Sequence, residues 1–244
     1  MLSQPQIYHI SPSILEDRLL FKSICLDMDN NYYWSSEWSE SFYIKLASAG
    51  FISTSYDSNM GLVLLPELQF DYAVLDFKNL HISKKVKKLI DKNNYKFSIN
   101  SRFDEVLKNI EDKHKYNWLK EQYAELLKKL HKSPIEKNFK IISVELICKD
   151  TDELISGEIG YIIGATYTSL SGFSSSEKRY NNYGTLQLVV LSLYLEKNGF
   201  SFWNLGHPCM RYKERLGCKT YSRNSFLSRW RRGIALPMIN PFEL

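Results

Sequence analysis

Clustered lysine and arginine side chains have the clearest chemical use in this sequence, because such clusters bind phosphate groups. The first cluster follows Ser83 and consists of Lys84, Lys85, Lys87, Lys88, Lys92 and Lys96. The second follows His207 and consists of Arg211, Lys213, Arg215, Lys219, Arg223, Arg229, Arg231 and Arg232. Lysines that neutralise phosphates supply most of the non-specific affinity of proteins for nucleic acids. The alternative is that the first cluster is a solvated helix face.

A metal site is the second possibility that the residue types raise. His207, Cys209 and Cys218 are potential ligands close in the sequence. A structural zinc site has four ligands, and no second closely spaced pair of Cys or His completes one, so we expect no bound metal. The four cysteines, which also include Cys25 and Cys148, are scattered, as is typical of reduced thiols in a cytosol-like compartment. We therefore predict a cytoplasmic protein.

The elements that would position these residues are clearest between residues 141 and 207. Alternation and β-branched content predict strands at 141–148, 154–162 and 165–171. Residues 185–197 are apolar nearly all round, which predicts a buried helix, and a last strand leads into His207. Antiparallel strands, a covering helix and one more strand are the core order of acetyltransferase-like (GNAT) folds. We predict an α+β protein with a mixed, mainly antiparallel sheet flanked by helices.

Capping residues predict several further helices. Ser39 and Gly50 bound one helix, Ser83 caps the lysine-rich helix, and Gly217 ends a short one. Helical periodicity adds amphipathic helices at 102–111 and 118–131.

Residues 56–61 are rich in Ser, Asp, Asn and Gly, and we expect a domain boundary there. The prediction is a small N-terminal domain at 1–61 and the acetyltransferase-like domain at 62–244.

Composition limits the classes of partner. Of the 244 residues 44% are hydrophobic, which suffices for a sizeable core, and the net charge of +5 permits RNA without requiring it. No apolar run approaches the about 18–20 residues of a membrane span, and Asp17 and Arg18 interrupt the first apolar run, unlike a signal peptide. We expect a monomer that does not bind membranes.

Between about residues 40 and 230 the sequence resembles the leucyl/phenylalanyl-tRNA–protein transferase family. The resemblance lies in the order and spacing of short matches, at 41–51, 73–75, 80–83, 101–106, Trp118, 130–131, 143–145, 153–154, Gly157, Gly160, 173–174 and 216–217. It implies transfer of an amino acid from charged tRNA to the α-amine of a protein N-terminus, which marks that protein for degradation by the N-degron route. It also implies that no cofactor is needed, and the loop before residue 185 lacks the glycine-rich pyrophosphate loop of acetyl-CoA users.

The resemblance places the catalytic position at Asn204, where the sequence departs from the family pattern of Asp with Gln two residues later. This chain has Asn204 and Gly206. Asparagine can orient an amine but cannot act as a general base. The 2′-hydroxyl of the terminal ribose, His207 or Glu145 could carry that role instead. The alternatives are that Asn204 bonds a nearby backbone at a strand end and that His207 is a turn residue.

A second departure concerns the amino acid that is transferred. Positions that the family fills with methionine align with Glu158 and Gly172, and a carboxylate position aligns with Leu170. Alternation puts Leu170 and Gly172 on one strand face, with Glu158 presented by the facing strand. A carboxylate there suits a guanidinium, so we predict arginine as the donor residue rather than leucine or phenylalanine. The alternative is that Glu158 faces solvent on an edge strand.

Three aromatic residues complete the predicted site. Trp118 aligns with a family tryptophan near the aminoacyl end of the tRNA, where it could stack on the terminal adenine, although a core position is the alternative. Tyr167 and Phe173 are expected to line the pocket unless they serve packing alone. The tRNA-binding residues are expected to be Lys84, Lys85, Lys87, Lys88, Arg211 and Lys213. A non-catalytic RNA- or peptide-binding relative and an acetyl-CoA-dependent acetyltransferase remain as competing functions.

Overall fold

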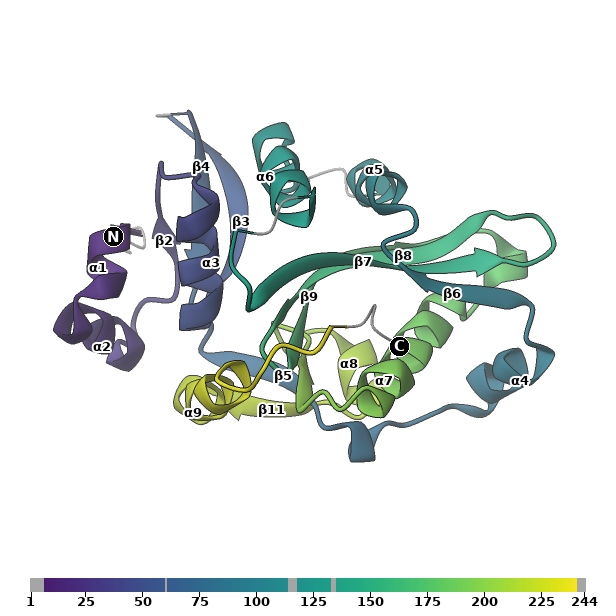
Figure 1. Cartoon of the computed structure of the whole chain (residues 1–244). Coiled ribbons are helices and arrows are strands. Elements are labelled where there is room, and N and C mark those ends of the chain that lie inside the picture. Colours follow the sequence, from purple (N-terminus) through teal and green to yellow (C-terminus); the bar gives the residue numbers. More distant parts are fainter. Residues whose placement is uncertain (1–6, 60, 114–117, 133–134, 241–244) are drawn as a thin grey trace, which may run out of the picture.

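One mixed sheet forms the centre of the computed structural model, which describes residues 7–59, 61–113, 118–132 and 135–240 (Figure 1). The strand order is β11-β5-β10-β9-β8-β7-β6, and neighbours are antiparallel except the parallel pair β9 and β10. The bounds are β5 Asp71–Leu75, β6 Tyr95–Ile99, β7 Phe139–Cys148, β8 Leu154–Ile163, β9 Thr166–Ser174, β10 Phe202–Asn204 and β11 Lys219–Ser222. The predicted mixed, mainly antiparallel sheet flanked by helices is confirmed.

Helices cover both faces of this sheet, and each face has its own apolar core. Face one carries α3 (Glu40–Ala49), α5 (Phe103–Lys113), α6 (Glu121–Lys132) and α9 (Arg223–Ile234). Face two carries α7 (Tyr183–Lys197), α4 (Lys84–Lys92) and α8 (Arg211–Leu216). In Figure 1, α5 and α6 lie above β7 and β8, and α7 lies below them. Since successive strand residues alternate between the faces, each residue of the sheet serves one core or the other.

The N-terminal part lies beside the sheet and contains a β-hairpin. Its elements are β1 (Tyr8–His9), α1 (Pro12–Glu16), α2 (Arg18–Leu26), β2 (Tyr33–Trp34), β3 (Ile52–Ser58) and β4 (Gly61–Glu67). β3 and β4 pair along their whole length, from Ile52 with Glu67 to Ser58 with Gly61. Residues 56–61, where we expected a domain boundary, therefore contain the hairpin turn, and a division into 1–61 and 62–244 would cut between hydrogen-bonded strands.

The helix ends follow the predicted capping residues. The Ser39 hydroxyl accepts a hydrogen bond from the Phe42 N–H, and the Ser83 hydroxyl accepts one from the Val86 N–H. Gly50 and Gly217 end α3 and α8 in the left-handed region, with φ of 99° and 107°. The buried helix α7 and the three central strands also lie where the sequence predicts them. The helix predicted at 118–131 begins later, at Glu121.

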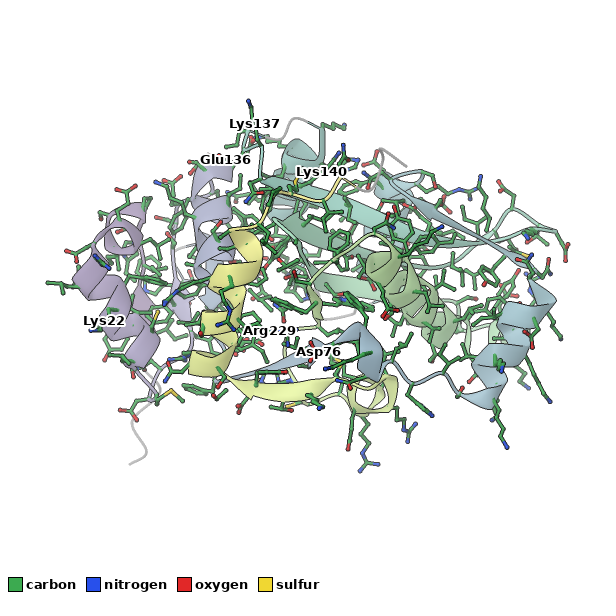
Figure 2. The ribbon with its side chains drawn as sticks, turned by 60° about the horizontal axis from the view of Figure 1, so that its bottom comes forward. Lys22, Asp76, Glu136, Lys137, Lys140 and Arg229 are labelled. Atoms are coloured by element: carbon green, nitrogen blue, oxygen red, sulfur yellow. The ribbon has the colours of Figure 1, made fainter. Side chains whose placement is uncertain are left out.

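Short 3₁₀ turns complete the chain: η1 (Phe77–Asn79) and η2 (Lys178–Tyr180). Asp76, directly before η1, pairs with Arg229 of α9, and the two side chains point toward one another in Figure 2. Across the described ranges, no helix combines the length and apolarity that crossing a bilayer demands.

Arg223, the first residue of α9, joins the C-terminal helix to the N-terminal part. The Arg223 side chain is fully buried. Its guanidinium donates hydrogen bonds to the backbone carbonyls of Gln69 at 3.2 Å, Leu68 at 2.6 Å and Asn30 at 3.1 Å. It also donates to the backbone carbonyls of Asp27 and Ile24. The guanidinium carbon lies 4.7 Å from the centre of the Phe70 ring. One side chain therefore satisfies carbonyl groups from α2, the following loop and the β4–β5 connection.

Candidate active site

Glu158 is the centre of a buried polar cluster on face two. Its Oε1 accepts hydrogen bonds from the hydroxyls of Tyr167 at 2.7 Å and Ser169 at 2.8 Å. Its Oε2 has a longer contact with Nε2 of Gln187, at 3.5 Å. The indole N–H of Trp203 in turn donates to the Ser169 hydroxyl at 2.8 Å. Strands β8, β9 and β10 and helix α7 together hold this carboxylate in place.

No cation accompanies this carboxylate among the residues that the structure describes. Glu158 is 4% exposed, so the alternative of a solvent-facing glutamate is excluded. Burial raises the pKa of its carboxyl to about 7, although the hydrogen bonds from Tyr167 and Ser169 act to lower it. Burial and the Glu158 charge also raise the pKa of the Tyr212 hydroxyl to about 12. A carboxylate in this state would gain a favourable interaction from any cationic group that reached it.

A β-bulge separates Leu170 from this cluster. Glu158 pairs with Gly172 and Ile159 with Ser171, but Gly160 pairs with Ser169, so Leu170 is an extra residue on β9. Leu170 packs against the core of face one, whereas Glu158 and Gly172 belong to face two. The prediction that Leu170 and Gly172 share a face is wrong, because a bulge interrupts strict alternation.

Gly172 allows β9 to approach Glu158 closely. A β-carbon at this position would lie 3.0 Å from the β-carbon of Glu158 and 2.9 Å from the carbonyl oxygen of Gly157. Both distances are shorter than ordinary van der Waals contacts. Any larger residue at 172 would therefore displace Glu158 or its strand.

Asn204 lies at the end of β10 and faces the opposite side of the sheet. It pairs with Thr168 and Val74, whereas its neighbour Trp203 packs in the core of face two. Asn204 is 1% exposed; its Oδ1 accepts the N–H of Gly206 at 2.9 Å, and its Nδ2 contacts the Thr168 hydroxyl at 3.4 Å. β10 pairs with β9 only as far as Thr168, and β9 then continues to Ser174. Asn204 and Glu158 are thus on opposite faces, near the point where these strands separate.

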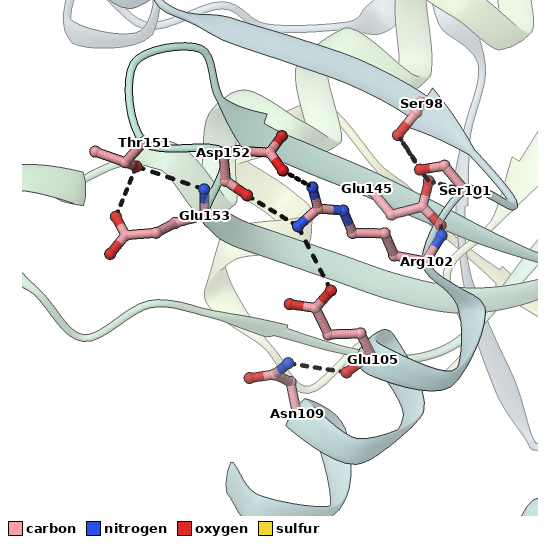
Figure 3. A network of polar contacts seen from close by, with 9 residues as sticks. All are labelled: Ser98, Ser101, Arg102, Glu105, Asn109, Glu145, Thr151, Asp152 and Glu153. Atoms are coloured by element: carbon pink, nitrogen blue, oxygen red, sulfur yellow. Dashed lines mark hydrogen bonds and ion pairs between the residues drawn. The ribbon is translucent and has the colours of Figure 1, made fainter.

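His207 and Glu145 occupy different surroundings from Asn204. His207 is exposed in the turn after β10, where its Nδ1 accepts the Cys209 N–H at 3.4 Å. Glu145 is fully buried at the N-terminus of α5 and accepts hydrogen bonds from Ser143 and from Ser98, Ser101 and Arg102. The last three residues are drawn beside it in Figure 3. Its carboxylate thus stabilises the start of a helix. Next to it, Arg102 lies between Asp152 and Glu105.

Trp118 and Phe173 both belong to face one. Trp118 is half-buried just before α6, with its ring 5.1 Å from that of Tyr123 in an edge-to-face contact. Phe173 lines a cavity of 610 Å³ whose walls also include Arg102, Asp152 and Glu177. Within the described part of the chain, no group of three or more His, Cys, Asp and Glu side chains could hold a metal ion.

Comparison with known proteins identifies the family. The sequence profile described as leucyl/phenylalanyl-tRNA protein transferase matches residues 74–231. The chain belongs to this family. Two curated relatives are the leucyl/phenylalanyl-tRNA–protein transferases of Flavobacterium johnsoniae and Flavobacterium psychrophilum, and each is 28% identical to this chain. The first match spans 162 residues, which is 64% of this chain and 69% of the relative. The second spans 161 residues, which is 63% of this chain and 69% of the relative. This family is a class of enzymes, so the chain is classified as an aminoacyltransferase.

Solved structures with some similarity include acetyltransferases. A GCN5-related N-acetyltransferase from Kribbella flavida is 10% identical, with a TM-score of 0.41 over 90% of this chain and 76% of that one. The C-terminal domain of a putative lysylphosphatidylglycerol synthetase from Agrobacterium fabrum is 10% identical, with a TM-score of 0.47 over 94% of this chain and 79% of that one.

The two basic clusters of this transferase family member meet in the structure. The His81 N–H donates to the Leu216 carbonyl at 2.9 Å, and its ring contacts the Arg215 carbonyl at 3.1 Å, so α4 starts beside the end of α8. Lys84, Lys85, Lys87, Lys88 and Arg211 are exposed. Lys213 is buried and donates to the carbonyls of Leu205 and His207, both at 2.6 Å. The prediction that Lys213 contacts tRNA is wrong, because its amine is already bound inside the protein.

Sequence reasoning missed most of the partners of Glu158. Ser169 and Gln187 were ordinary polar residues in a strand and a helix, and Trp203 was read as part of a strand. Gln187 had one available signal, since it is the one polar residue on an otherwise apolar turn of a helix that is predicted to be buried. A buried amide requires hydrogen-bond partners, which points toward a polar group in the sheet below.

Proposed function

We propose that this chain transfers an amino acid, arginine, from aminoacyl-tRNA to the α-amine of an acceptor polypeptide. The observation that carries the arginine assignment is the buried carboxylate of Glu158. Hydroxyl groups donate hydrogen bonds to it, and no Lys or Arg side chain among the described residues pairs with it. A guanidinium would add the missing charge and donate two hydrogen bonds at once. Oε2 has the weaker existing contact, to Gln187, and is the atom that the donor side chain would reach first.

The chemistry requires little beyond positioning of the two substrates. The amine nitrogen attacks the ester carbonyl carbon, the bond from that carbon to the ribose oxygen breaks, and the proton that the amine loses ends on that oxygen. Conversion of an ester to an amide needs no added energy source, and orientation alone supplies several kcal/mol of the barrier reduction. Asn204 cannot take the proton, so we assign its transfer to the 2′-hydroxyl of the ribose, with His207 as the alternative.

The exposed lysines of α4 and Arg211 of α8 would hold the phosphates of the tRNA. These residues come from the two basic clusters that meet at His81. Trp118, on face one, remains our candidate for stacking on the terminal adenine. We propose that the reaction takes place in the cytoplasm, on acceptors with acidic N-terminal residues that are thereby marked for degradation.

Transfer of leucine or phenylalanine is the second candidate, because the curated relatives bear that name. The experiment that decides uses purified protein, tRNA charged separately with Arg, Lys, Leu and Phe, and a panel of N-terminal peptides. We expect transfer from Arg-tRNA, and Glu158→Gln should reduce it by about 10–100-fold, which corresponds to loss of a charged hydrogen-bond pair. Glu196→Gln, the same change at an exposed position of α7, is the matched control and should leave transfer unchanged.

Transfer from Leu- or Phe-tRNA but not from Arg-tRNA would overturn the arginine assignment. Equal loss with all donors in the Glu158→Gln variant would show that Glu158 has a structural role only. Absence of transfer from every charged tRNA would favour the non-catalytic binding relative.

A further inference from the structure

Gln69, in the connection between β4 and β5, has a buried oxygen that is not satisfied. The residue is 4% exposed, and its Nε2 donates to the Glu67 carboxylate at 3.3 Å. Its Oε1 has no hydrogen-bond partner within the described residues. A buried acceptor without a partner destabilises the folded state, so its presence in a native protein requires an explanation.

Glu67 fixes the orientation of this amide. The carboxylate is 8% exposed and also accepts a hydrogen bond from Nδ2 of Asn31 at 2.7 Å. A flipped Gln69 amide would place its oxygen against the Glu67 oxygens, which is repulsive. The amide nitrogen is therefore held toward Glu67, and the oxygen is left as the available acceptor.

The side-chain amide of Gln69 lies beside Gly206, two residues after Asn204. A β-carbon at Gly206 would be 3.9 Å from Nε2 of Gln69 and 3.1 Å from Cδ1 of Ile52. The Gly206 N–H donates to Oδ1 of Asn204, which keeps a second lone pair for another donor. The side-chain amide of Gln69, with Nε2 as its nearer atom, and Oδ1 of Asn204 therefore both lie beside Gly206.

We propose that Gln69 binds the α-amine of the acceptor polypeptide, with Glu67 as the residue that positions it. This inference rests on the proposed transfer to an amine. A neutral primary amine has two N–H groups, which can bond to Oε1 of Gln69 and Oδ1 of Asn204 while its lone pair is directed at the ester. Entry of the amine requires Ile52 to move aside from Gly206. The amine then supplies the hydrogen bond that Oε1 lacks.

Gln69→Met tests this role, because it keeps the length of the side chain and removes the acceptor oxygen. We expect the KM for an acceptor peptide to rise about tenfold, the loss of one hydrogen bond, with an unchanged KM for charged tRNA. The melting temperature of each variant is measured as well, because the change also removes the hydrogen bond from Nε2 to the buried Glu67 carboxylate. Glu67→Ala should raise the acceptor KM similarly and Glu67→Gln much less, because a glutamine oxygen at position 67 can still hold Nε2 of Gln69. Gln122→Met, on the exposed side of α6, is the control.

A binding measurement makes the inference independent of turnover. Peptides with N-terminal Asp, Glu, Arg or Lys are titrated into the protein by calorimetry, each with a free and with an acetylated amine. The wild type should bind a free-amine peptide more tightly than its acetylated form, and Gln69→Met should lose that preference. No preference in the wild type, or an unchanged preference in the variant, overturns the inference and leaves Oε1 to a bound water. The proposed function fails separately, through absence of transfer from any charged tRNA.

Discussion

The hydroxyl of Tyr167 donates a 2.7 Å hydrogen bond to Oε1 of Glu158 across neighbouring strands. Both residues are buried on face two, and the hydroxyl of Ser169 joins them from the same strand as Tyr167. These neutral donors lower the free-energy cost of burying the ionised Glu158 carboxylate but do not cancel that cost. The pKa of Glu158 is therefore still raised to about 7. The ionisation of Glu158 is therefore coupled to the stability of the fold.

Stability should decline with pH through this one group. Its pKa is higher in the folded protein, about 7, than the ordinary glutamate value of 4.5. The stabilisation is fully present below about pH 4.5 and is lost as the pH rises through about 7, because the unfolded chain releases the proton first. We expect the free energy of unfolding of the wild type, relative to Glu158→Gln, to fall by at most about 3 kcal/mol between pH 4.5 and 8. Urea unfolding of both proteins at several pH values measures this difference, and parallel pH profiles would contradict it. Glu196→Gln should give a parallel profile.

Neutralising the exposed face of α4 should weaken tRNA binding in a salt-dependent way. In a variant with glutamine at positions 84, 85, 87 and 88, each phosphate contact that is lost should reduce the slope of log K against log salt by about 0.7–0.9. Filter binding or fluorescence anisotropy across a salt series measures this slope. The control is a variant with glutamine at four exposed lysines elsewhere: Lys22, Lys129, Lys132 and Lys137, the first and last of which are labelled in Figure 2. Equal slopes for the two variants would argue against a tRNA surface at α4.

Replacing Arg223 should destabilise the whole chain. Arg223→Met leaves the carbonyls of Leu68, Gln69 and Asn30 without their buried donor. We expect a loss of about 3 kcal/mol in the free energy of unfolding, because unsatisfied buried carbonyls cost about 1–3 kcal/mol each and partial rearrangement recovers some of that. Denaturant unfolding measures the loss. Arg232→Met, on the exposed face of the same helix, should change stability by less than about 0.5 kcal/mol.

Local sequence signals predicted the elements well, because their causes are local. The caps at Ser39 and Ser83 need only a hydroxyl at the residue before the helix, which accepts a hydrogen bond from the backbone N–H three residues later. Helix α7 is apolar on all sides because it is packed between the sheet and α4, and the sequence shows that directly. The turn at 56–61 has the composition of any surface turn, so nothing local distinguishes a hairpin from a domain boundary.

The candidate site was predicted less completely, because long-range packing decides it. The burial of Lys213 depends on where the chain turns after Leu205 and on two carbonyls that accept from it. The separation of Asn204 and Glu158 onto opposite faces depends on the register of three strands. The surroundings of the Gln69 amide depend on Glu67 of β4 and on Gly206, which is far away in the sequence. None of these is encoded within a window of a few residues.

The bulge at Leu170 makes this position tolerant of a change in chain length. Removing Leu170 would leave Ser169 beside Glu158 and Phe173 in the core of face one, because the remaining residues would then alternate regularly. A strand that kept the extra residue without a bulge would instead carry Gly172 and Phe173 to the opposite cores. Homologues can thus differ by one residue here and keep the same side chains around the carboxylate. A sequence alignment drawn without a gap would then pair residues from opposite sides of the sheet.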